Sequence, residues 1–367
     1  MTKDNNEKIV VLTAGGTGGH IYPADALAGE LVKRNYKVVL FTDERGLNNY
    51  KGKLGEIENK AILSGSVVGK SFFTKIKSLI KVSFGVAQAF VELFKKRPVC
   101  VVGFGGYASF PTAIASILHG VPLVIHEQNS VMSRTNRILA RFSSMVAQSF
   151  RNVKNTPSNA KSVLIGMPVR ETIVNLYQKE YTPFDKDGNF NMVVIGGSQG
   201  AKVFAETIPD AISMLSKEEQ EKLVIYQQCR KGEEEFVAKK YKNLAVKVEV
   251  KSFFDNMPEL YEKASVIISR SGASSVYEIA VAGVPSILVP LPTSADNHQY
   301  FNAKEFTEGG GGIVIEQKDF LPEVLSQHLS KFMAKPEVLK MMSKNIKKQA
   351  ITDAAKRLAD EVEKFVK

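Results

Sequence analysis

The chain has 367 residues and a formal net charge of +11, and 44% of its residues are hydrophobic. This length favours two domains with filled cores, and no uncharged apolar run is long enough for a membrane span. The first apolar run is too short for a signal peptide. The basic excess favours an anionic partner such as lipid or phosphate. Because RNA-binding aromatic motifs and zinc-finger spacings are missing, we expect no nucleic-acid partner.

A glycine-rich turn dominates the first half of the chain. An apolar, β-branched run at 9–12 leads into the glycine turn 15–19, and a helical pattern begins near Pro23. A strand, a glycine turn and a helix in this order aim free backbone N–H groups at an anion. Because Ile21 stands where the G-x-G-x-x-G motif has its last glycine, we do not expect a nicotinamide cofactor.

Residues 67–97 interleave apolar and basic side chains, and the segment 70–97 carries seven basic residues against one acidic residue. A helix with an ordinary core face accounts for part of this pattern, but not for two adjacent phenylalanines among lysines. An apolar tip surrounded by lysines favours docking on an anionic membrane, and a solvated helix is the alternative. The residues predicted to dock are Phe72, Phe73, Ile76, Lys70, Lys75, Lys77 and Lys81.

Two further apolar runs, at 99–102 and 123–125, are predicted strands. The first leads into Gly103-Phe104-Gly105-Gly106-Tyr107 and a helix from Pro111, and the second ends in His126-Glu127-Gln128-Asn129. The carboxyl ends of parallel strands form the crevice in which such sheets bind ligands. We therefore expect these four polar groups in a site, and an ordinary polar loop is the alternative.

The second half opens with another strand, glycine turn and helix, at 192–195, 196–200 and from Val203 onward. Two such openings predict two nucleotide-binding halves, with ligands in the cleft between them. The same turn fits the G-x-S-x-G motif of serine hydrolases, in which Ser198 would be the nucleophile with Glu278 and His298 as partners. The hydrolase is the main alternative.

A third helix start carries small hydroxyl residues. The runs 248–253 and 266–269 are predicted strands, and the second enters Arg270-Ser271-Gly272-Ala273-Ser274-Ser275 before a helical pattern. Free N–H groups and hydroxyls at a helix start favour a phosphate. Glu278 follows one turn later, where a carboxylate is placed to hold both hydroxyls of a ribose. The alternative for Glu278 is an exposed acid that stabilises the helix dipole.

The sequence does not favour a metal site. Asp185-Lys186-Asp187 has the D-x-D form that metal-dependent glycosyltransferases use, but it precedes a strand and is followed by Gly-Asn, so we expect a surface turn. Cys100 and Cys229 lie in or beside apolar runs and are expected to be buried thiols. We therefore expect neither a metal nor a disulfide.

Six of these segments match one family in register: 15–20, 103–107, 126–129, 196–201, 270–273 and 299–303. Together they closely resemble the MurG family of bacterial transferases, which add N-acetylglucosamine to lipid I to make lipid II. The resemblance covers essentially the whole chain. It implies an α/β fold of two Rossmann-like, doubly wound parallel-sheet domains facing a central cleft, known as the GT-B fold. The domains would be 1–169 and 170–351, with a helix at 352–367 packing back on the first.

The resemblance also implies an activity and a place. The reaction would be an inverting transfer of N-acetylglucosamine from UDP-N-acetylglucosamine to the C4 hydroxyl of the N-acetylmuramoyl group of lipid I, for peptidoglycan synthesis, cell shape and cell division. UDP-N-acetylglucosamine would be a substrate, and no cofactor is expected. The protein would be peripheral on the cytoplasmic face of the plasma membrane, with the anionic membrane surface, lipid I and other cell-wall or division proteins as partners. A non-catalytic nucleotide-binding membrane adaptor is a further alternative.

The resemblance assigns site residues position by position. The expected contacts to the sugar and phosphates are Thr17, Gly18, Gly19, Asn129, Arg170, Ser198 and Gln299. The expected contacts to uracil, diphosphate and ribose are the backbone of Phe254 with Ala273, Ser274, Ser275, Val276, Tyr277 and Glu278. The chain departs from the family at Met167, at the pair Ser274-Ser275 and at His298, where asparagine, leucine-threonine and glutamine are usual.

Glycosyl transfer also needs a group that takes the proton of the acceptor hydroxyl. His20 stands at the mouth of the first glycine turn and titrates near neutrality, so it is the expected base. Glu127 is a second choice. The alternative for His20 is a residue that only orients the loop.

Overall fold

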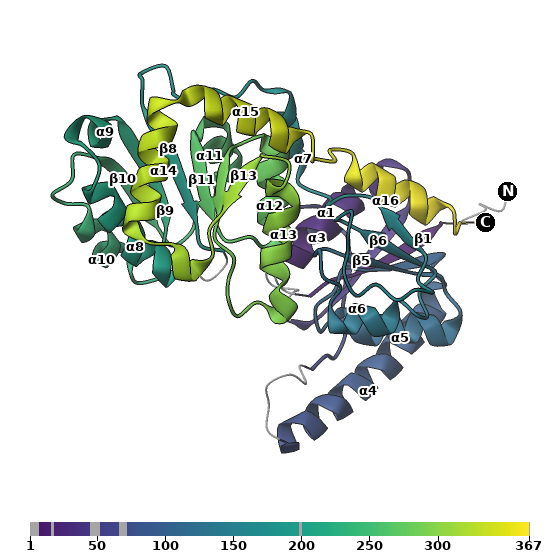
Figure 1. Cartoon of the computed structure of the whole chain (residues 1–367). Coiled ribbons are helices and arrows are strands. Elements are labelled where there is room, and N and C mark those ends of the chain that lie inside the picture. Colours follow the sequence, from purple (N-terminus) through teal and green to yellow (C-terminus); the bar gives the residue numbers. More distant parts are fainter. Residues whose placement is uncertain (1–6, 16–17, 45–51, 66–71, 198–199, 367) are drawn as a thin grey trace. The chain divides into compact units, whose positions relative to one another are not determined.

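The computed structural model describes residues 7–15, 18–44, 52–65, 72–197 and 200–366 of the chain. It divides into two units, and each is an α/β domain built around one parallel sheet (Figure 1). The first unit comprises Met1–Arg170 and Asp353–Lys367, and the second comprises Glu171–Thr352. None of the helices within the described ranges combines the length and the apolarity that a bilayer crossing requires.

The first unit contains a seven-stranded sheet in the order β3-β2-β1-β4-β5-β6-β7, and all neighbouring strands are parallel. The strands are β1 (Ile9–Thr13), β2 (Lys37–Thr42), β3 (Glu58–Ala61), β4 (Cys100–Gly103), β5 (Leu123–Glu127), β6 (Met145–Gln148) and β7 (Ser162–Leu164). The helices are α1 (Gly18–Lys33), α3 (Lys53–Glu56), α4 (Phe72–Lys96), α5 (Ser109–His119), α6 (Arg134–Leu139) and α16 (Ala354–Glu363). Figure 1 shows α4 as a long helix that packs beside α5 and continues past it.

The second unit contains a six-stranded parallel sheet in the order β10-β9-β8-β11-β12-β13. The strands are β8 (Phe190–Ile195), β9 (Leu223–Gln228), β10 (Lys247–Lys251), β11 (Val266–Ser269), β12 (Ser286–Leu288) and β13 (Gly312–Val314). The helices are α7 (Glu171–Val174), α8 (Lys202–Ser213), α9 (Lys217–Lys222), α10 (Glu234–Lys240), α11 (Met257–Lys263), α12 (Ala273–Ala282), α13 (His298–Thr307), α14 (Pro322–Ala334) and α15 (Pro336–Lys347).

Both sheets have the same topology. The strand order reverses between β1 and β4 in the first sheet and between β8 and β11 in the second. In doubly wound folds, ligands bind beyond the carboxyl ends of the strands at this reversal. We call the carboxyl ends of each such pair the switch point of that unit. The predicted α/β fold with two Rossmann-like, doubly wound parallel sheets is confirmed.

Burial on both faces explains the apolar strands. Val10, Val11 and Leu12 of β1 are wholly buried, and they join different apolar clusters on the two faces of the sheet. Parallel strands covered by helices on both sides have no polar face, so continuous apolar runs replace alternation. These runs made the central strands predictable from the sequence.

The last helix, α16, lies in the first unit. Leu358, Ala359 and Val362 join the apolar cluster that contains the buried side chains of α1. Arg34, the residue after α1, donates hydrogen bonds to Asp360 over 2.7 Å and to Glu363 over 2.9 Å. The first domain is therefore built from both ends of the chain.

Some elements differ from the predictions. The helix predicted from Pro111 begins at Ser109, and the strand predicted at 248–253 ends at Lys251. The apolar runs 38–42 and 286–289 also predict strands, and they correspond to β2 and β12. The sequence patterns missed five strands: β3, β6, β7, β9 and β13. Three of them, β3, β7 and β13, are short edge strands with few fully buried side chains, so they lack a continuous apolar run.

Candidate functional site

The segments that follow β1 and β4 meet at the first switch point. The Gly15 N–H donates a hydrogen bond to the Gly105 carbonyl over 3.0 Å. A Cβ added to Gly106 would lie 2.8 Å from the Gly15 Cα, and Gly106 has a φ of +81°. Glycine alone tolerates both the close contact and this backbone conformation, so the two loops approach each other backbone to backbone. Thr17 lies outside the described residues.

The first turn of α1 carries the predicted sugar contacts Gly18 and Gly19 and the predicted base His20. The His20 Nδ1 lies 3.1 Å from the Gln128 Oε1. Burial is the largest influence on the His20 imidazole and lowers its pKa below the usual 6.5. A helix N-terminus also disfavours positive charge. The imidazole is therefore neutral at pH 7 and able to accept a proton.

Three residues of the segment 126–129, His126, Glu127 and Gln128, are buried rather than presented to solvent. His126 is fully buried, and burial lowers its pKa to about 3. The Glu127 carboxylate accepts hydrogen bonds from the N–H groups of Asn129 and Ser133, each over 3.0 Å, and from the Asn136 side chain over 2.8 Å. Burial raises the Glu127 pKa. The Glu127 carboxylate therefore fixes the conformation of this loop. Asn129 remains partly exposed.

The second switch point has its own glycine loop, after β8. A Cβ on Gly196 would lie 2.4 Å from the Ala201 nitrogen, and Gly197 and Gly200 have φ values of +82° and +68°. The Gln228 side chain at the end of β9 accepts from the Gly196 N–H over 3.1 Å and donates to the Ser252 carbonyl over 3.1 Å. It thereby ties the loop to the segment after β10. Ser198 lies outside the described residues.

The helix start beside this loop is the N-terminus of α12, where Gly272 is the N-cap and offers no side chain to the first N–H groups. The hydroxyls of Ser271 and Ser274 are buried and have no hydrogen-bond partner among the described residues. Unused hydroxyls beside a helix N-terminus fit an anionic ligand. Ala273, Ser275, Val276 and Tyr277 belong to the same first turns.

Glu278 is only 7% exposed, so the alternative of an exposed acid at the helix start is wrong. Its Oε2 accepts a hydrogen bond from the Tyr261 hydroxyl over 3.1 Å. A carboxylate held in this way has little rotational freedom, which suits the recognition of a pair of hydroxyls.

The other predicted contacts occupy defined places. Arg170, the last residue of the first unit, stacks its guanidinium 4.7 Å from the Tyr22 ring centre. Phe254 is buried in the segment between β10 and α11, and the Lys251 ammonium lies 5.6 Å from the centre of its ring. The Gln299 side chain accepts from the Leu291 N–H over 3.0 Å.

Sequence reasoning missed three organising side chains. Gln228 lies in a strand that was not predicted, and the Tyr261 contact joins two helices, so neither had a local signal. Arg270 stands in a predicted phosphate cradle, but its guanidinium donates to the carbonyls of Val289 and Pro290, each over 3.1 Å, and to Gln317 over 2.6 Å. Arg270 therefore holds the segment after β12.

The Asp185 segment forms the predicted surface turn, and both cysteines are buried. Asp185 Oδ1 accepts from the N–H groups of Asp187 and Asn189 and so closes the predicted turn. Within the described ranges no group of three His, Cys, Asp or Glu residues is arranged to hold a metal. Cys100 and Cys229 are buried free thiols, as predicted, and burial raises their pKa values to about 12 and about 11.

The helix α4 bears an exposed apolar surface away from the switch point. Ser78, Val82, Ala89 and Leu93 are buried at helical spacing. The opposite side exposes Ile76, Leu79, Ile80 and Phe84, which we call the α4 patch, and Leu79 is 62% and Phe84 64% exposed. Lys77 and Lys81 are exposed between them. Lys70 and the side chains of Phe72, Phe73 and Lys75 lie outside the described residues.

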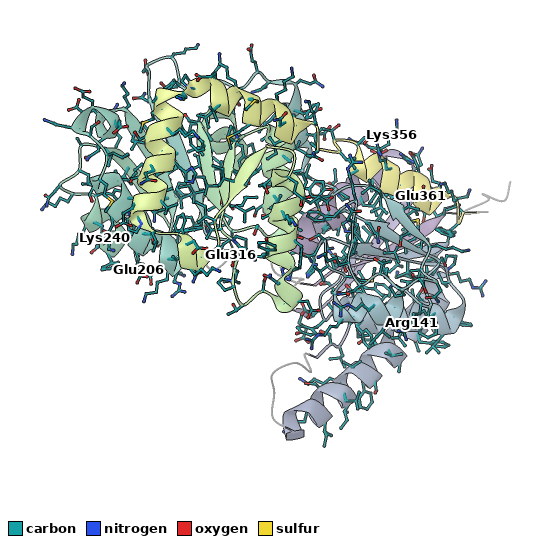
Figure 2. All side chains as sticks on the ribbon, in the orientation of Figure 1. Arg141, Glu206, Lys240, Glu316, Lys356 and Glu361 are labelled. Atoms are coloured by element: carbon teal, nitrogen blue, oxygen red, sulfur yellow. The ribbon has the colours of Figure 1, made fainter. Side chains whose placement is uncertain are left out.

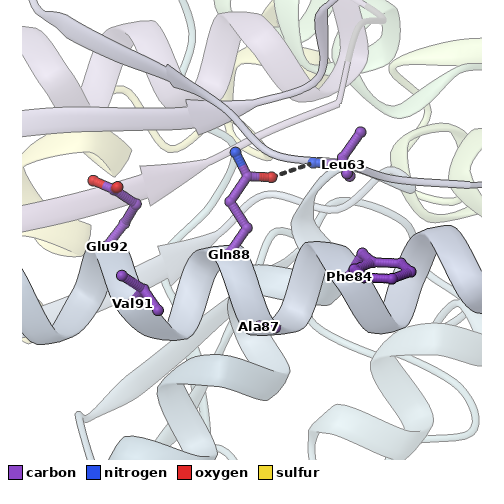
Figure 3. Close-up of a pocket in the computed structure, with 6 residues that line it drawn as sticks. All are labelled: Leu63, Phe84, Ala87, Gln88, Val91 and Glu92. Atoms are coloured by element: carbon purple, nitrogen blue, oxygen red, sulfur yellow. Dashed lines mark hydrogen bonds between the residues drawn. The ribbon is translucent and has the colours of Figure 1, made fainter.

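A groove of about 500 Å³ adjoins this patch, where α4 faces the segment after β3 (Figure 3). Gln88 accepts a hydrogen bond from the Leu63 N–H there over 3.1 Å. None of the groove residues belongs to a glycine loop, so the groove is not part of either switch point. Its lining is formed by Leu63, Phe84, Ala87, Gln88, Val91 and Glu92.

Comparisons with known proteins cover both units. The glycosyltransferase family 28 N-terminal domain matches residues 10–148, and the glycosyltransferase family 28 C-terminal domain matches residues 191–358. The crystal structure of Acinetobacter baumannii MurG is similar to this chain with a TM-score of 0.78 and 29% sequence identity, over 97% of this chain and 99% of that one.

Two relatives are similar over nearly their whole length. One from Rhodospirillum rubrum is 42% identical over 96% of this chain and 90% of its own. One from Agrobacterium fabrum is 40% identical over 98% of this chain and 94% of its own. Both carry the name UDP-N-acetylglucosamine–N-acetylmuramyl-(pentapeptide) pyrophosphoryl-undecaprenol N-acetylglucosamine transferase.

Proposed function

This chain belongs to glycosyltransferase family 28, in the MurG family, and from this premise we propose that it makes lipid II for peptidoglycan synthesis. The reaction moves N-acetylglucosamine from UDP-N-acetylglucosamine to the C4 hydroxyl of the N-acetylmuramoyl group of lipid I. The observation that carries the proposal is the family similarity over nearly the whole chain, together with a neutral histidine at the first switch point and a helix start with unpartnered hydroxyls at the second.

The donor is assigned to the second unit. As the sugar leaves, the bond between its C1 and the diphosphate oxygen breaks, and the electron pair stays on the diphosphate. The N-terminus of α12 and the hydroxyls of Ser271 and Ser274 are placed to stabilise that charge. In this proposal Glu278 accepts hydrogen bonds from the ribose hydroxyls, and the Phe254 backbone forms hydrogen bonds with the uracil edge. These donors stabilise the leaving group in our proposal without a metal or a cofactor.

Proton removal is assigned to the first unit. The C4 hydroxyl attacks C1 from the side opposite the diphosphate, which inverts the configuration, and its proton passes to His20. Burial depresses the His20 pKa, so the ring is neutral at pH 7 and one of its nitrogens is available to accept that proton. Glu127 is not chosen, because its carboxylate already accepts three hydrogen bonds from the loop it pins.

A transfer assay tests the proposal. The full chain is incubated with UDP-N-acetylglucosamine and a short-chain lipid I analogue, and UDP and the disaccharide product are both counted. We expect them in equal amounts, and no UDP release without the acceptor. A membrane adaptor would bind UDP without releasing it from the sugar. A hydrolase, which the family assignment already disfavours, would be labelled at Ser198 by a fluorophosphonate probe.

The lipid acceptor requires a membrane surface, and we assign docking to the α4 patch. Large exposed apolar side chains in such numbers are unusual on a monomer unless they contact something. Lys77 and Lys81 lie among them, and Arg141, exposed after α6, adds a further positive charge to this unit (Figure 2). In this proposal the apolar side chains enter the lipid surface, and each basic residue near the anionic headgroups contributes about 1 kcal/mol of binding free energy. We propose the cytoplasmic face of the plasma membrane as its location, which the family similarity implies.

Vesicle co-sedimentation tests the docking assignment. Replacing Leu79, Ile80 and Phe84 together with serine should weaken binding to anionic vesicles by at least tenfold and leave UDP affinity unchanged. A matched variant replaces three exposed apolar side chains of the second unit, Met214, Leu321 and Met341, with serine and should bind vesicles like the original protein. Equal binding by both variants would remove the assignment.

A further inference from the structure

A chain of hydrogen bonds runs from His20 into the core of the first unit, and each bond in it has a fixed direction from donor to acceptor. The Gln128 Nε2 lies 2.5 Å from the Phe104 carbonyl oxygen. A carbonyl oxygen only accepts, so the Gln128 amide must present its N–H there and cannot be rotated by half a turn. The Gln128 Oε1 is then fixed toward His20, 3.1 Å from its Nδ1.

The amide orientation decides which nitrogen of His20 carries the proton. The Gln128 Oε1 is an acceptor, so the His20 Nδ1 must be the protonated nitrogen of the neutral ring. In the neutral ring with its proton on Nδ1, the Nε2 carries the lone pair. The Phe104 backbone also makes a hydrogen bond with the His20 ring, which raises the His20 pKa against the larger effect of burial. The base function therefore belongs to Nε2.

The other side of Gln128 reinforces the same orientation. Its Nε2 also lies 3.3 Å from the His126 Nδ1, so that nitrogen accepts and the His126 proton is on Nε2. The His126 Nε2 faces the Ser149 Oγ over 3.1 Å, and the Ser149 hydroxyl lies 3.8 Å from the Met167 sulfur. A thioether sulfur only accepts, so Ser149 donates at the far end.

Every step in this chain thus points one way, and the fully buried His126 stays neutral and does not compete for a proton. Met167, which stands where the family usually has asparagine, fixes the direction of the last hydrogen bond in the chain. The usual asparagine can donate or accept, whereas methionine leaves a single direction.

We propose that Gln128 is a positioning residue that holds His20 in the Nδ1–H form, with His126, Ser149 and Met167 fixing the Gln128 amide. This inference rests on the proposed function only in taking His20 as the base. A neutral imidazole in water exchanges readily between its two forms, so an acceptor held at Nδ1 selects the form whose Nε2 carries the lone pair. A base in the wrong form loses most of its catalytic effect.

Nitrogen-15 NMR of the histidine-labelled full chain reads the two forms directly. The chain has five histidines, which single replacements assign. At pH 7.5 we expect His20 as Nδ1–H and His126 as Nε2–H. In Gln128→Met, which keeps the length but removes the acceptor, His20 should populate the Nε2–H form, and kcat should fall on the order of 10²-fold with an unchanged KM for UDP-N-acetylglucosamine.

Gln220 supplies the matched control. It likewise bridges two backbone groups, donating to the Leu215 carbonyl over 2.9 Å and accepting from the Ala245 N–H over 3.0 Å. Gln220→Met should leave the His20 spectrum and kcat unchanged. An Nε2–H form of His20 in the unaltered protein would overturn the inference, as would an unchanged His20 form in Gln128→Met. Failure of the transfer assay would refute the proposed function, whereas the NMR spectra test the position of the His20 proton independently of that assay.

Discussion

At the first switch point the side chains beside the glycine loops are imidazoles and an amide, whereas at the second they are hydroxyls and a carboxylate. The two sheets nevertheless share one strand order, and glycine loops follow the corresponding strands in each. The topology therefore fixes where a ligand binds, and the residues at the strand ends decide what is done to it. In our account the first unit accepts a proton and the second holds an anion.

The largest expected effect is the loss of the base. His20→Ala should lower kcat by about 10² to 10⁴-fold, because general base catalysis contributes that much. His328 on α14 is another partly buried histidine with a lowered pKa, and His328→Ala should retain full turnover. Because the His20 pKa is depressed, kcat/KM of the original protein should hold at pH 7 and fall only below pH 6.5, as the imidazole is protonated. Full turnover by His20→Ala would show that His20 only orients the loop.

The second effect concerns the donor side. Glu278→Gln should weaken UDP binding about tenfold, since a charge-assisted hydrogen bond is replaced by a neutral one. The variant should also bind UDP and 2′-deoxy-UDP more nearly alike, and calorimetric titration with both nucleotides measures this. Glu337→Gln, at an exposed position on α15, is the control. Undiminished preference for UDP in Glu278→Gln would place the ribose elsewhere.

The close approach of the first glycine loops is expected to matter for stability. Gly106→Ala adds a Cβ 2.8 Å from the Gly15 Cα at a φ of +81°, and should destabilise the first unit by about 2–3 kcal/mol. Gly120 has a φ of +70° but nothing within 4 Å of the added atom, so Gly120→Ala should cost only about 1 kcal/mol. Hydrogen exchange of β1 and β4 reports the opening free energy of this unit. Equal losses in the two variants would contradict the contact argument.

The smallest expected effect is a pH dependence of stability from His126. Its pKa is about 3 in the folded protein and about 6.5 when unfolded, so the unfolded state binds more protons between these values. Stability should therefore decrease as the pH falls below 6.5, by about 1 kcal/mol between pH 7 and pH 5.5. Pulse proteolysis in urea at both pH values should show a weaker pH dependence for His126→Gln. Parallel curves for the two proteins would mean that His126 is not the titrating group.

The comparison of the units also shows what a sequence can predict. The central strands and their glycine loops were predictable because burial on both faces leaves continuous apolar runs that end in glycine. The roles of Gln128 and Arg270 were not predictable, because their hydrogen-bond partners come from other segments of the fold. Glu127 bonds to the residues that directly follow it, and their path had no signal in the sequence. The edge strands β3, β7 and β13 were missed because their burial is incomplete. Residue types thus indicated the location of each site, whereas the direction of each side chain required the structure.

One comparison of three proteins tests the division of labour most directly: UDP affinity and turnover at saturating UDP-N-acetylglucosamine, for the original chain, His20→Ala and Glu278→Gln. We expect His20→Ala to bind UDP like the original and to lose turnover by at least about 10²-fold. Glu278→Gln should bind UDP about tenfold more weakly and keep most of its turnover at saturation. If His20→Ala weakens UDP binding as much as Glu278→Gln does, or if both variants lose turnover equally, the assignment of proton transfer to one unit and anion binding to the other is contradicted.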